Sequence, residues 1–368
     1  MPTRFLFSKL VAASWRPATI GMVLAIGLAG CAAGLDRLET TTPTLTTSQR
    51  DDLLKHAKLP AELGLPERFN PGVAVGAVAS LSNVTVALCQ VPTPRPREIG
   101  GQYGVPVVLA TVNGKTGVRM LLDSGSNRNL FGYSLAHELG ITAVTGLDPV
   151  TSSGIGGTVD NLIGVARSIK LETIEFRRVL ALIGPDTQVL SMTHGFWNNP
   201  QALILSLNTL RMLSYVSIDA PNGTVTFAPR DTYHARPSSI FATAVPMQWG
   251  NGLPLLEVIL DGKTVPCYVD TGGDYGLLLP RKLAGDLGYW KPGHETIGIS
   301  KGVAGASLSA TYDVREVKIG LANFANLNAR TQVTGPDAAG GNVLLGNAAL
   351  RQLRVTFDFQ HGLLWMER

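Results

Sequence analysis

Two aspartates stand at the ends of two similar hydrophobic segments, and their side chains are the best placed in the sequence to do chemistry. Asp123 follows the apolar residues 120–122, and Asp270 follows residues 267–269. A hydroxyl residue and a glycine come next in both cases, so each segment is predicted to be a strand that ends in a tight turn. Two carboxyl groups held about 3 Å apart in a shielded site cannot both ionise, so they share one proton and act as an acid–base pair.

The segments that lead to the two aspartates are also alike. Asn113-Gly114 lies before the first aspartate, and Asp261-Gly262 lies before the second. Both pairs favour the two-residue turns of β-hairpins, because both residues tolerate a positive φ. Each half of the chain is therefore predicted to open with a strand, a hairpin turn and a second strand that carries the aspartate.

The order of motifs after each aspartate is repeated as well. Each half continues with a short helix ending in Leu-Gly, a glycine-rich hairpin tip, a hydrophobic pair and an aspartate near a strand end. These features lie at residues 139–140, 154–157, 204–205 and 219 in the first half, and at 287–288, 302–305, 344–345 and 358 in the second. The near-constant spacing predicts an internal duplication that brings the two carboxylates together.

The composition favours a β-rich protein with two lobes. The chain has 368 residues, of which 45% are hydrophobic and 16% charged, and it contains 41 glycines. Arg4, Lys9 and Arg16 account for three of the four net positive charges, so the rest is nearly neutral and no nucleic-acid partner is expected. The three cysteines and six histidines form no closely spaced ligand set, so neither a metal nor a cofactor is expected.

Residues 1–30 have the features of an export signal. A basic region precedes the apolar residues 20–29, which are too few to span a membrane comfortably. The apolar run ends in Leu-Ala-Gly-Cys31, which resembles the cleavage box of bacterial lipoproteins, whose cysteine becomes the lipidated first residue. An ordinary signal peptide or an uncleaved anchor are the alternatives.

The lipoprotein resemblance implies a location for the mature chain. Lipid on Cys31 would hold the protein on a membrane of the bacterial envelope, facing the periplasm. Ala32 after the cysteine favours the outer membrane. Residues 31–98 are then expected to contain the lipidated cysteine, a flexible tether and N-terminal docking strands.

The ordered set of motifs resembles the aspartic peptidases. In that family a D-[ST]-G loop lies beside a hydrophobic-hydrophobic-glycine segment, and a glycine-rich flap covers the cleft. Residues 123–125 and 270–272 match the loop, and residues 344–346 match the second segment. The resemblance covers roughly residues 100–368; each half has about the size of a retropepsin subunit, and the fused arrangement is like pepsin.

The resemblance implies a fold and a function. The fold is an all-β, bilobal acid-protease fold of two retropepsin-like barrel lobes, residues 99–230 and 243–368, with a linker at 231–242 and a cleft between the lobes. The function is that of a monomeric aspartic endopeptidase that needs no cofactor and takes a polypeptide as its substrate. Water activated between Asp123 and Asp270 would attack the peptide carbonyl, and no covalent intermediate would form.

The resemblance also implies roles for the neighbours of the two aspartates. The hydroxyl groups of the D-[ST]-G loops should cross-link the loops, the glycine N–H groups should orient the carboxylates, and Ser126 should steady the outer oxygen of Asp123. The flap would bind an extended substrate and exclude water. The predicted supporting residues are Ser124, Gly125, Ser126, Thr271 and Gly272, and the predicted flap residues are Gly154, Ile155, Gly156 and Gly157. The loop 302–305 is a weaker flap candidate, because fused enzymes often use only one flap.

Two departures from the family pattern leave alternatives open. Ser206 stands where a glycine is expected and could crowd the active loop, and Gly273 stands where pepsins have Ser or Thr. A catalytically inactive, peptide-binding scaffold on the same fold is therefore an alternative. A serine hydrolase is a second one, although Ser134 lacks the context of a nucleophile elbow. Cys89 and Cys267 are expected either to pair in an oxidising envelope or to remain free.

Overall fold

A computed structural model describes the protein over most of its length. The described residues are 44–66, 68–70, 72–76, 81–89, 105–188, 202–291, 293, 296–335 and 337–368. The predicted signal peptide and Cys31 lie outside these residues.

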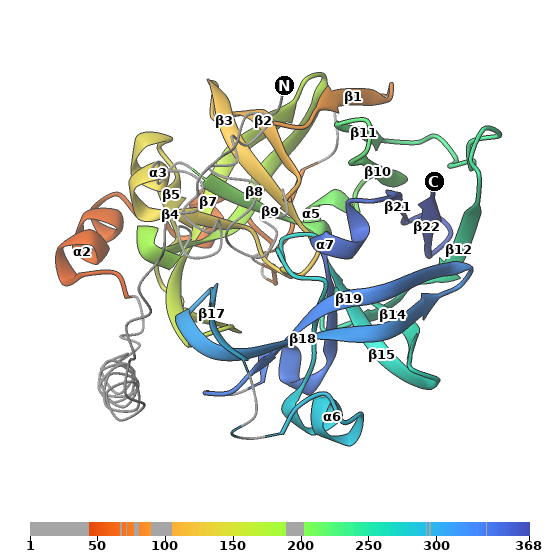
Figure 1. Ribbon diagram of the computed structural model, residues 1–368. Helices are drawn as coiled ribbons and strands as arrows, with labels where there is room; N and C mark the ends of the chain where they lie inside the picture. The colour runs from red at the N-terminus through yellow and green to blue at the C-terminus, as the bar shows by residue number, and fades with distance from the viewer. Residues whose placement is uncertain are drawn as a thin grey trace, which may run out of the picture. The chain divides into compact units, whose positions relative to one another are not determined.

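The first lobe is built on an eight-stranded sheet (Figure 1). Its strands are β2 (Val107–Val112), β3 (Lys115–Asp123), β4 (Leu130–Gly132), β5 (Thr142–Ala143), β6 (Val150–Gly154), β7 (Gly157–Leu171), β8 (Ile174–Gly184) and β9 (Ala202–Ser206). The sheet closes on itself because β2 pairs with both β3 and β7. The helices α3 (Tyr133–Glu138) and α5 (Leu207–Leu210) follow β4 and β9.

The second lobe repeats this plan. Its sheet is formed by β13 (Gln248–Gly250), β14 (Leu253–Leu260), β15 (Lys263–Asp270), β16 (Leu277–Leu278), β17 (Thr296–Gly302), β18 (Gly305–Ile319), β19 (Ala322–Gln332) and β20 (Val343–Gly346). Here β14 pairs with both β15 and β18, which closes this sheet in the same way. The helices α6 (Arg281–Asp286) and α7 (Asn347–Leu350), and the 3-10 turn η2 (Ala338–Gly341), complete the lobe.

The predicted turns and helix ends are confirmed. Asn113 and Gly114 have φ values of 50° and 93°, and Asp261 and Gly262 have values of 45° and 85°, so both hairpins turn through positive φ as expected. The glycines that follow α3 and α6 also adopt positive φ, which ends each helix with a left-handed residue.

A third, six-stranded sheet joins the two lobes. Its strands are β1 (Val84–Ala87), β10 (Tyr215–Asp219), β11 (Thr224–Ala228), β12 (Ala242–Pro246), β21 (Arg354–Asp358) and β22 (Leu363–Glu367). Strands β10 and β21 lie side by side and antiparallel, with Ser217 opposite Thr356 (Figure 1). These two residues occupy equivalent positions in the two halves, so the pseudo-two-fold relation of the duplication passes through this pair.

The described N-terminal residues pack on the first lobe. The helix α2 (Thr47–Lys55) begins with a capping box between Thr46 and Gln49, and the 3-10 turn η1 (Pro60–Leu63) follows it. Single bridges then join Lys58 to Val144 and Ala74 to Val179. These contacts place the described residues of this segment, 44–66, 68–70 and 72–76, against the first lobe.

The core is made of the inward faces of the two closed sheets. Strand β3 is mostly exposed at its start and continuously buried from Met120 to Asp123, because Met120 and Leu122 pack into one hydrophobic cluster and Leu121, on the opposite face, packs into another. Large side chains such as Phe131 and Phe176 are fully buried.

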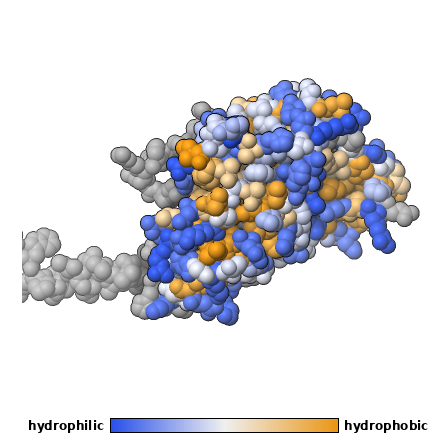
Figure 2. Space-filling view, turned by 90° about the vertical axis from the view of Figure 1, so that its right-hand side faces the viewer, coloured by the Kyte–Doolittle hydropathy of each residue, from blue (hydrophilic) through white to orange (hydrophobic). Residues whose placement is uncertain are grey.

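Polar residues surround smaller groups of apolar ones on the face drawn in Figure 2. The predicted all-β, bilobal acid-protease fold is confirmed.

None of the helices in the described part of the chain combines the length and the hydrophobicity that crossing a membrane would require.

Candidate active site

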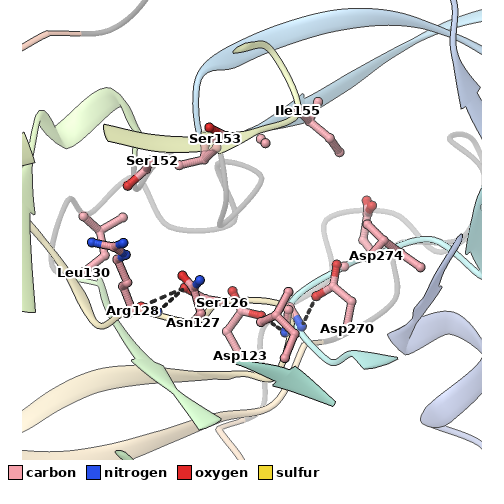
Figure 3. Close-up of a pocket in the computed structure, with 18 of the residues that line it drawn as sticks. Asp123, Ser126, Asn127, Arg128, Leu130, Ser152, Ser153, Ile155, Asp270 and Asp274 are labelled. Carbon is pink, nitrogen blue, oxygen red and sulfur yellow. Dashed lines mark hydrogen bonds between the residues drawn. The ribbon is translucent and has the colours of Figure 1, made fainter. Parts of the chain in front are cut away.

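The two aspartates lie at the ends of equivalent central strands and face each other (Figure 3). Asp123 ends β3 and pairs in parallel with Ser206 of β9, while Asp270 ends β15 and pairs with Gly346 of β20. The two carboxyl groups are hydrogen-bonded to each other. The duplicated strand-turn motif therefore brings together two acids that are 147 residues apart in the chain.

A glycine of each active loop lies against the carboxyl group of the other loop. A Cβ atom on Gly125 would lie 2.4 Å from Oδ1 of Asp270, and one on Gly272 would lie 2.6 Å from Cγ of Asp123. Any larger residue would push the carboxyl groups apart. The N–H of Gly125 donates to Asp123 Oδ1 at 2.8 Å, and that of Gly272 donates to Asp270 Oδ1 at 3.0 Å. The same glycines thus permit the close approach and orient both carboxylates.

The hydroxyl groups of Ser124 and Thr271 cross-link the two loops. Ser124 Oγ accepts from the N–H of Thr271 at 2.9 Å and donates to the carbonyl of Val269 at 2.7 Å. Thr271 Oγ1 accepts from the N–H of Ser124 at 2.9 Å and donates to the carbonyl of Leu122 at 2.7 Å. Both side chains are buried, so these reciprocal bonds satisfy groups that water cannot reach and fix the lobes together at the site.

The surroundings raise the pKa of both carboxyl groups. Burial is the largest cause for Asp123, and the neighbouring charge of Asp270 raises its pKa further. Burial also raises the pKa of Asp270, while a hydrogen bond from Tyr275 opposes this shift. The pair therefore titrates as a unit and holds one proton over a range of pH in which isolated carboxyl groups would both be ionised.

Tyr275 is a site residue that the sequence analysis missed. Its hydroxyl donates to Oδ2 of Asp270, and its side chain is only 3% exposed. A Cβ atom on Gly273 would lie 2.5 Å from Cζ of Tyr275 and 2.8 Å from Oδ2 of Asp270. The absence of a side chain at residue 273 thus leaves room for a tyrosine hydroxyl from two residues later. The missing hydroxyl at Gly273 was the signal that another donor was needed.

Ser126 lies in the first loop, but its hydroxyl does not make the contact that was predicted for it. Ser126 Oγ donates to the carbonyl of Arg128 at 2.7 Å and accepts from the N–H of Arg128 at 3.4 Å. The backbone N–H of Ser126 instead acts on Asp123, whose pKa it lowers. The hydroxyl therefore shapes the loop, and the main chain stabilises the carboxylate.

Two hairpin tips, one from each lobe, meet above the aspartates. The predicted flap residues Gly154–Gly157 connect β6 to β7, and the loop 302–305 connects β17 to β18. The N–H of Ala304 donates to the carbonyl of Ile155 at 3.0 Å. A Cβ atom on Gly156 would lie 2.7 Å from the carbonyl carbon of Ala304. The loop 302–305, the weaker flap candidate, therefore packs directly on the tip of the first hairpin.

The aspartates and the flaps enclose a cavity of about 340 Å³. Its floor includes both aspartates, and its roof includes Ser152, Ser153 and Ile155 from the first flap (Figure 3). The opening between floor and roof is lined by backbone and side chains of both lobes, as an extended peptide would require.

Comparisons with known proteins agree with this geometry. Residues 108–205 match the family model described as aspartyl protease. This match supports the predicted relationship to the aspartic peptidases over these residues of the first lobe. No curated protein gives a match.

Two solved structures of aspartyl proteases are similar to this chain. A retropepsin-like aspartic protease from Rickettsia conorii has 18% identity and a TM-score of 0.26, over 34% of this chain and 90% of the other. The aspartic proteinase from Irpex lacteus has 12% identity and a TM-score of 0.44, over 78% of this chain and 97% of the other.

The first half departs from the predicted motif at Ser206, where a glycine was expected, and the structure gives the reason. Ser206 Oγ donates to the carbonyl of Gly72 at 2.9 Å, and Thr209 Oγ1 donates to the same oxygen at 3.0 Å. The serine therefore anchors the N-terminal segment instead of crowding the active loop. At the equivalent Gly346, a Cβ atom would lie 2.1 Å from the carbonyl oxygen of Tyr275, so only glycine fits there.

The structure also bears on the state of the two described cysteines and on the role of Ser134. Cys89 and Cys267 are both free thiols. Ser134 lies within the first turn of α3, and its hydroxyl donates to Asp186 at 2.5 Å in an exposed position. This serine is outside the lining of the cavity described above.

Proposed function

We propose that the protein is an aspartic endopeptidase that hydrolyses extended polypeptides. The observation that supports this most directly is the pair of carboxyl groups, hydrogen-bonded to each other, both with a raised pKa, and lining a cavity under two hairpin tips. The family match of residues 108–205 supports the same activity. Asp123 and Asp270 are the proposed catalytic residues.

In the proposed reaction the dyad works with a single shared proton. The ionised carboxyl removes a proton from water, and the resulting nucleophile attacks the scissile carbonyl. The protonated carboxyl donates to the carbonyl oxygen as the tetrahedral intermediate forms. The cross-links through Ser124 and Thr271 hold the two acids in register, and the flaps exclude bulk water and offer backbone groups to the substrate.

Asparagine substitutions of the two aspartates test the proposal. Asp123→Asn and Asp270→Asn should each lower kcat/KM by roughly 100- to 10,000-fold, because an amide cannot exchange the shared proton. The measurement is cleavage of a peptide library across pH, with circular dichroism to show that the fold is retained. Asp286→Asn, on the exposed face of α6, is the matched control. Full activity in either dyad variant would exclude the dyad mechanism.

A catalytically inactive, peptide-binding protein on the same fold is the second candidate. Ser206 and Gly273 were the features that favoured it. The hydroxyl of Ser206 is directed to Gly72, and Tyr275 supplies the donor that Gly273 lacks, so both departures are compatible with catalysis. A peptide that binds in the cleft and is never cleaved by the wild-type protein would support this candidate instead.

We also propose that Cys31 carries lipid and anchors the protein at a bacterial membrane, facing the periplasm. The Leu-Ala-Gly-Cys31 box and the apolar run before it support this location.

A further inference from the structure

The charged side chains that line the cavity differ in whether an oppositely charged or proton-sharing partner lies beside them. Asp123 and Asp270 share a proton, and Asp274 forms an ion pair with Arg330 at 3.1 Å. The remaining charged lining residue is Arg128. Within the described part of the chain, no carboxylate lies within ion-pair distance of its guanidinium.

Arg128 is also partly removed from water. Burial lowers the pKa of its guanidinium, which has therefore lost hydration without gaining a counter-ion. Figure 3 shows the side chain beside Leu130, on the first-lobe side of the cavity, with Ser152 of the flap opposite. A partly desolvated cation without a counter-ion is stabilised when an anion binds beside it.

The backbone of Arg128 is held firmly. Its carbonyl accepts from Ser126 Oγ at 2.7 Å. The next residue, Asn129, is fully buried, and its side-chain amide donates to the carbonyl of Leu180 at 2.7 Å. The guanidinium thus extends from a fixed base, which reduces the entropy lost when it binds a ligand.

The second lobe has no corresponding cation. Arg128 follows Asp123 by five residues, and the residue that follows Asp270 by five is Tyr275. Tyr275 is turned back onto Asp270 and is buried there. The two flanks of the dyad therefore differ in charge, although the lobes are duplicated.

We propose that Arg128 forms a carboxylate subsite, so that the substrate is an extended polypeptide with an acidic residue on one side of the scissile bond. This inference rests on the proposed peptidase function. A planar guanidinium binds a carboxylate through two parallel hydrogen bonds. The carboxylate comes from an aspartate or glutamate side chain or from the C-terminus of the substrate.

Paired peptides distinguish these sources. One glutamate is moved through each position of a C-terminally amidated peptide set, and a matched set carries glutamine; a third set has a free C-terminus. Wild-type protein should cleave the glutamate peptide about tenfold faster in kcat/KM at one position, at a pH above about 5 where glutamate is ionised. Arg128→Gln should abolish this preference, and Arg128→Glu should favour lysine at the same position. A preference confined to the free C-terminus would assign the subsite to a terminal carboxylate.

Arg211→Gln is the matched control. Burial lowers the pKa of Arg211 as well, but its guanidinium lies 3.7 Å from the ring centre of Trp249 and outside the cavity lining. This variant should keep the glutamate preference. Equal cleavage of the glutamate and glutamine peptides by the wild type, or a preference that survives in Arg128→Gln, would overturn the proposal.

Failure of the carboxylate subsite can be distinguished from failure of the proposed peptidase function. If the wild type cleaves none of the peptides, the peptidase assignment fails, and the dissociation constants of the same peptides decide the subsite. Tighter binding of the glutamate peptide by about tenfold, lost in Arg128→Gln, supports it. Equal dissociation constants contradict it.

Discussion

At the scale of single residues, the two aspartates have different supports. Asp123 accepts from the backbone of its own loop, whereas Asp270 also accepts from the hydroxyl of Tyr275. Tyr275 is a positioning residue in this arrangement, because it acts on the outer oxygen of Asp270. The hydrogen bond stabilises the ionised form, so it lowers the pKa of Asp270 against the effect of burial.

Tyr275→Phe should shift the acidic limb of the pH profile upward. Without the hydroxyl the ionised dyad is less stable, so the pKa of its first ionisation rises, by about one unit. The singly protonated dyad then forms only at higher pH, and kcat/KM falls most on the acidic side. The measurement is the pH dependence of kcat/KM, which reports the ionisations of the free enzyme.

Tyr268→Phe is the control for this prediction. Tyr268 is buried in the same small hydrophobic cluster as Tyr275, and its hydroxyl lies beside Gly250 of β13. Its loss should leave the acidic limb in place. An unshifted limb in Tyr275→Phe, or an equal loss of activity at every pH, would show that Tyr275 has a packing role only.

The residue scale also shows where sequence reasoning stops. The D-[ST]-G loops were predictable because each motif is local and each residue type has one geometric function. The role of Tyr275 was not predictable, since a tyrosine beside a turn can point in several directions. Only the packing of its ring in the space left open at Gly273 directs its hydroxyl to Asp270.

At the scale of elements, hairpins and short helices followed from local patterns, but their tertiary contacts did not. The two flap tips were visible as glycine-rich loops, and their meeting depends on the orientation of both lobes. The docking of the N-terminal segment under β9 was hidden for a similar reason. It depends on a hydrogen bond from Ser206 to Gly72, 134 residues earlier in the chain.

Ser206 and Gly346 should respond differently to alanine, although they are equivalent positions. Ser206→Ala removes one of two donors to the Gly72 carbonyl, so it should lower the free energy of unfolding by about 1 kcal/mol and leave kcat/KM nearly unchanged. Gly346→Ala introduces a Cβ atom against the Tyr275 carbonyl, so it should lower the stability by about 1–3 kcal/mol and displace the active loop.

Urea unfolding and kcat/KM measured on both variants check this prediction. A large loss of activity in Ser206→Ala would mean that the serine supports the active loop directly. Normal activity in Gly346→Ala would mean that the Tyr275 backbone can move away without disturbing Asp270.

At the scale of the whole molecule, one chain supplies both halves of the candidate site. The duplication was predictable from the repeated order of motifs, whereas the sheet that joins the lobes was not. That sheet depends on the pairing of β10 with β21, and on ion pairs such as that between Asp219 and Arg354, with a distance of 3.1 Å from Nε to Oδ2. Because these contacts and the dyad lie within residues 105–368, catalysis is expected to be independent of any membrane attachment.

Cys31→Ser tests that separation of attachment from catalysis. If the cysteine carries lipid, the variant should leave the membrane fraction, because the thiol to which the lipid is attached is gone. Its kcat/KM on a soluble peptide should match that of the wild type, since the residues that form the dyad are unchanged. Membrane fractionation and a peptide assay on the same preparation give both results, and Cys89→Ser serves as a control for the loss of a thiol. Unchanged membrane association in Cys31→Ser would contradict the lipid anchor, and a loss of peptide cleavage would show that residue 31 contributes to the catalytic body.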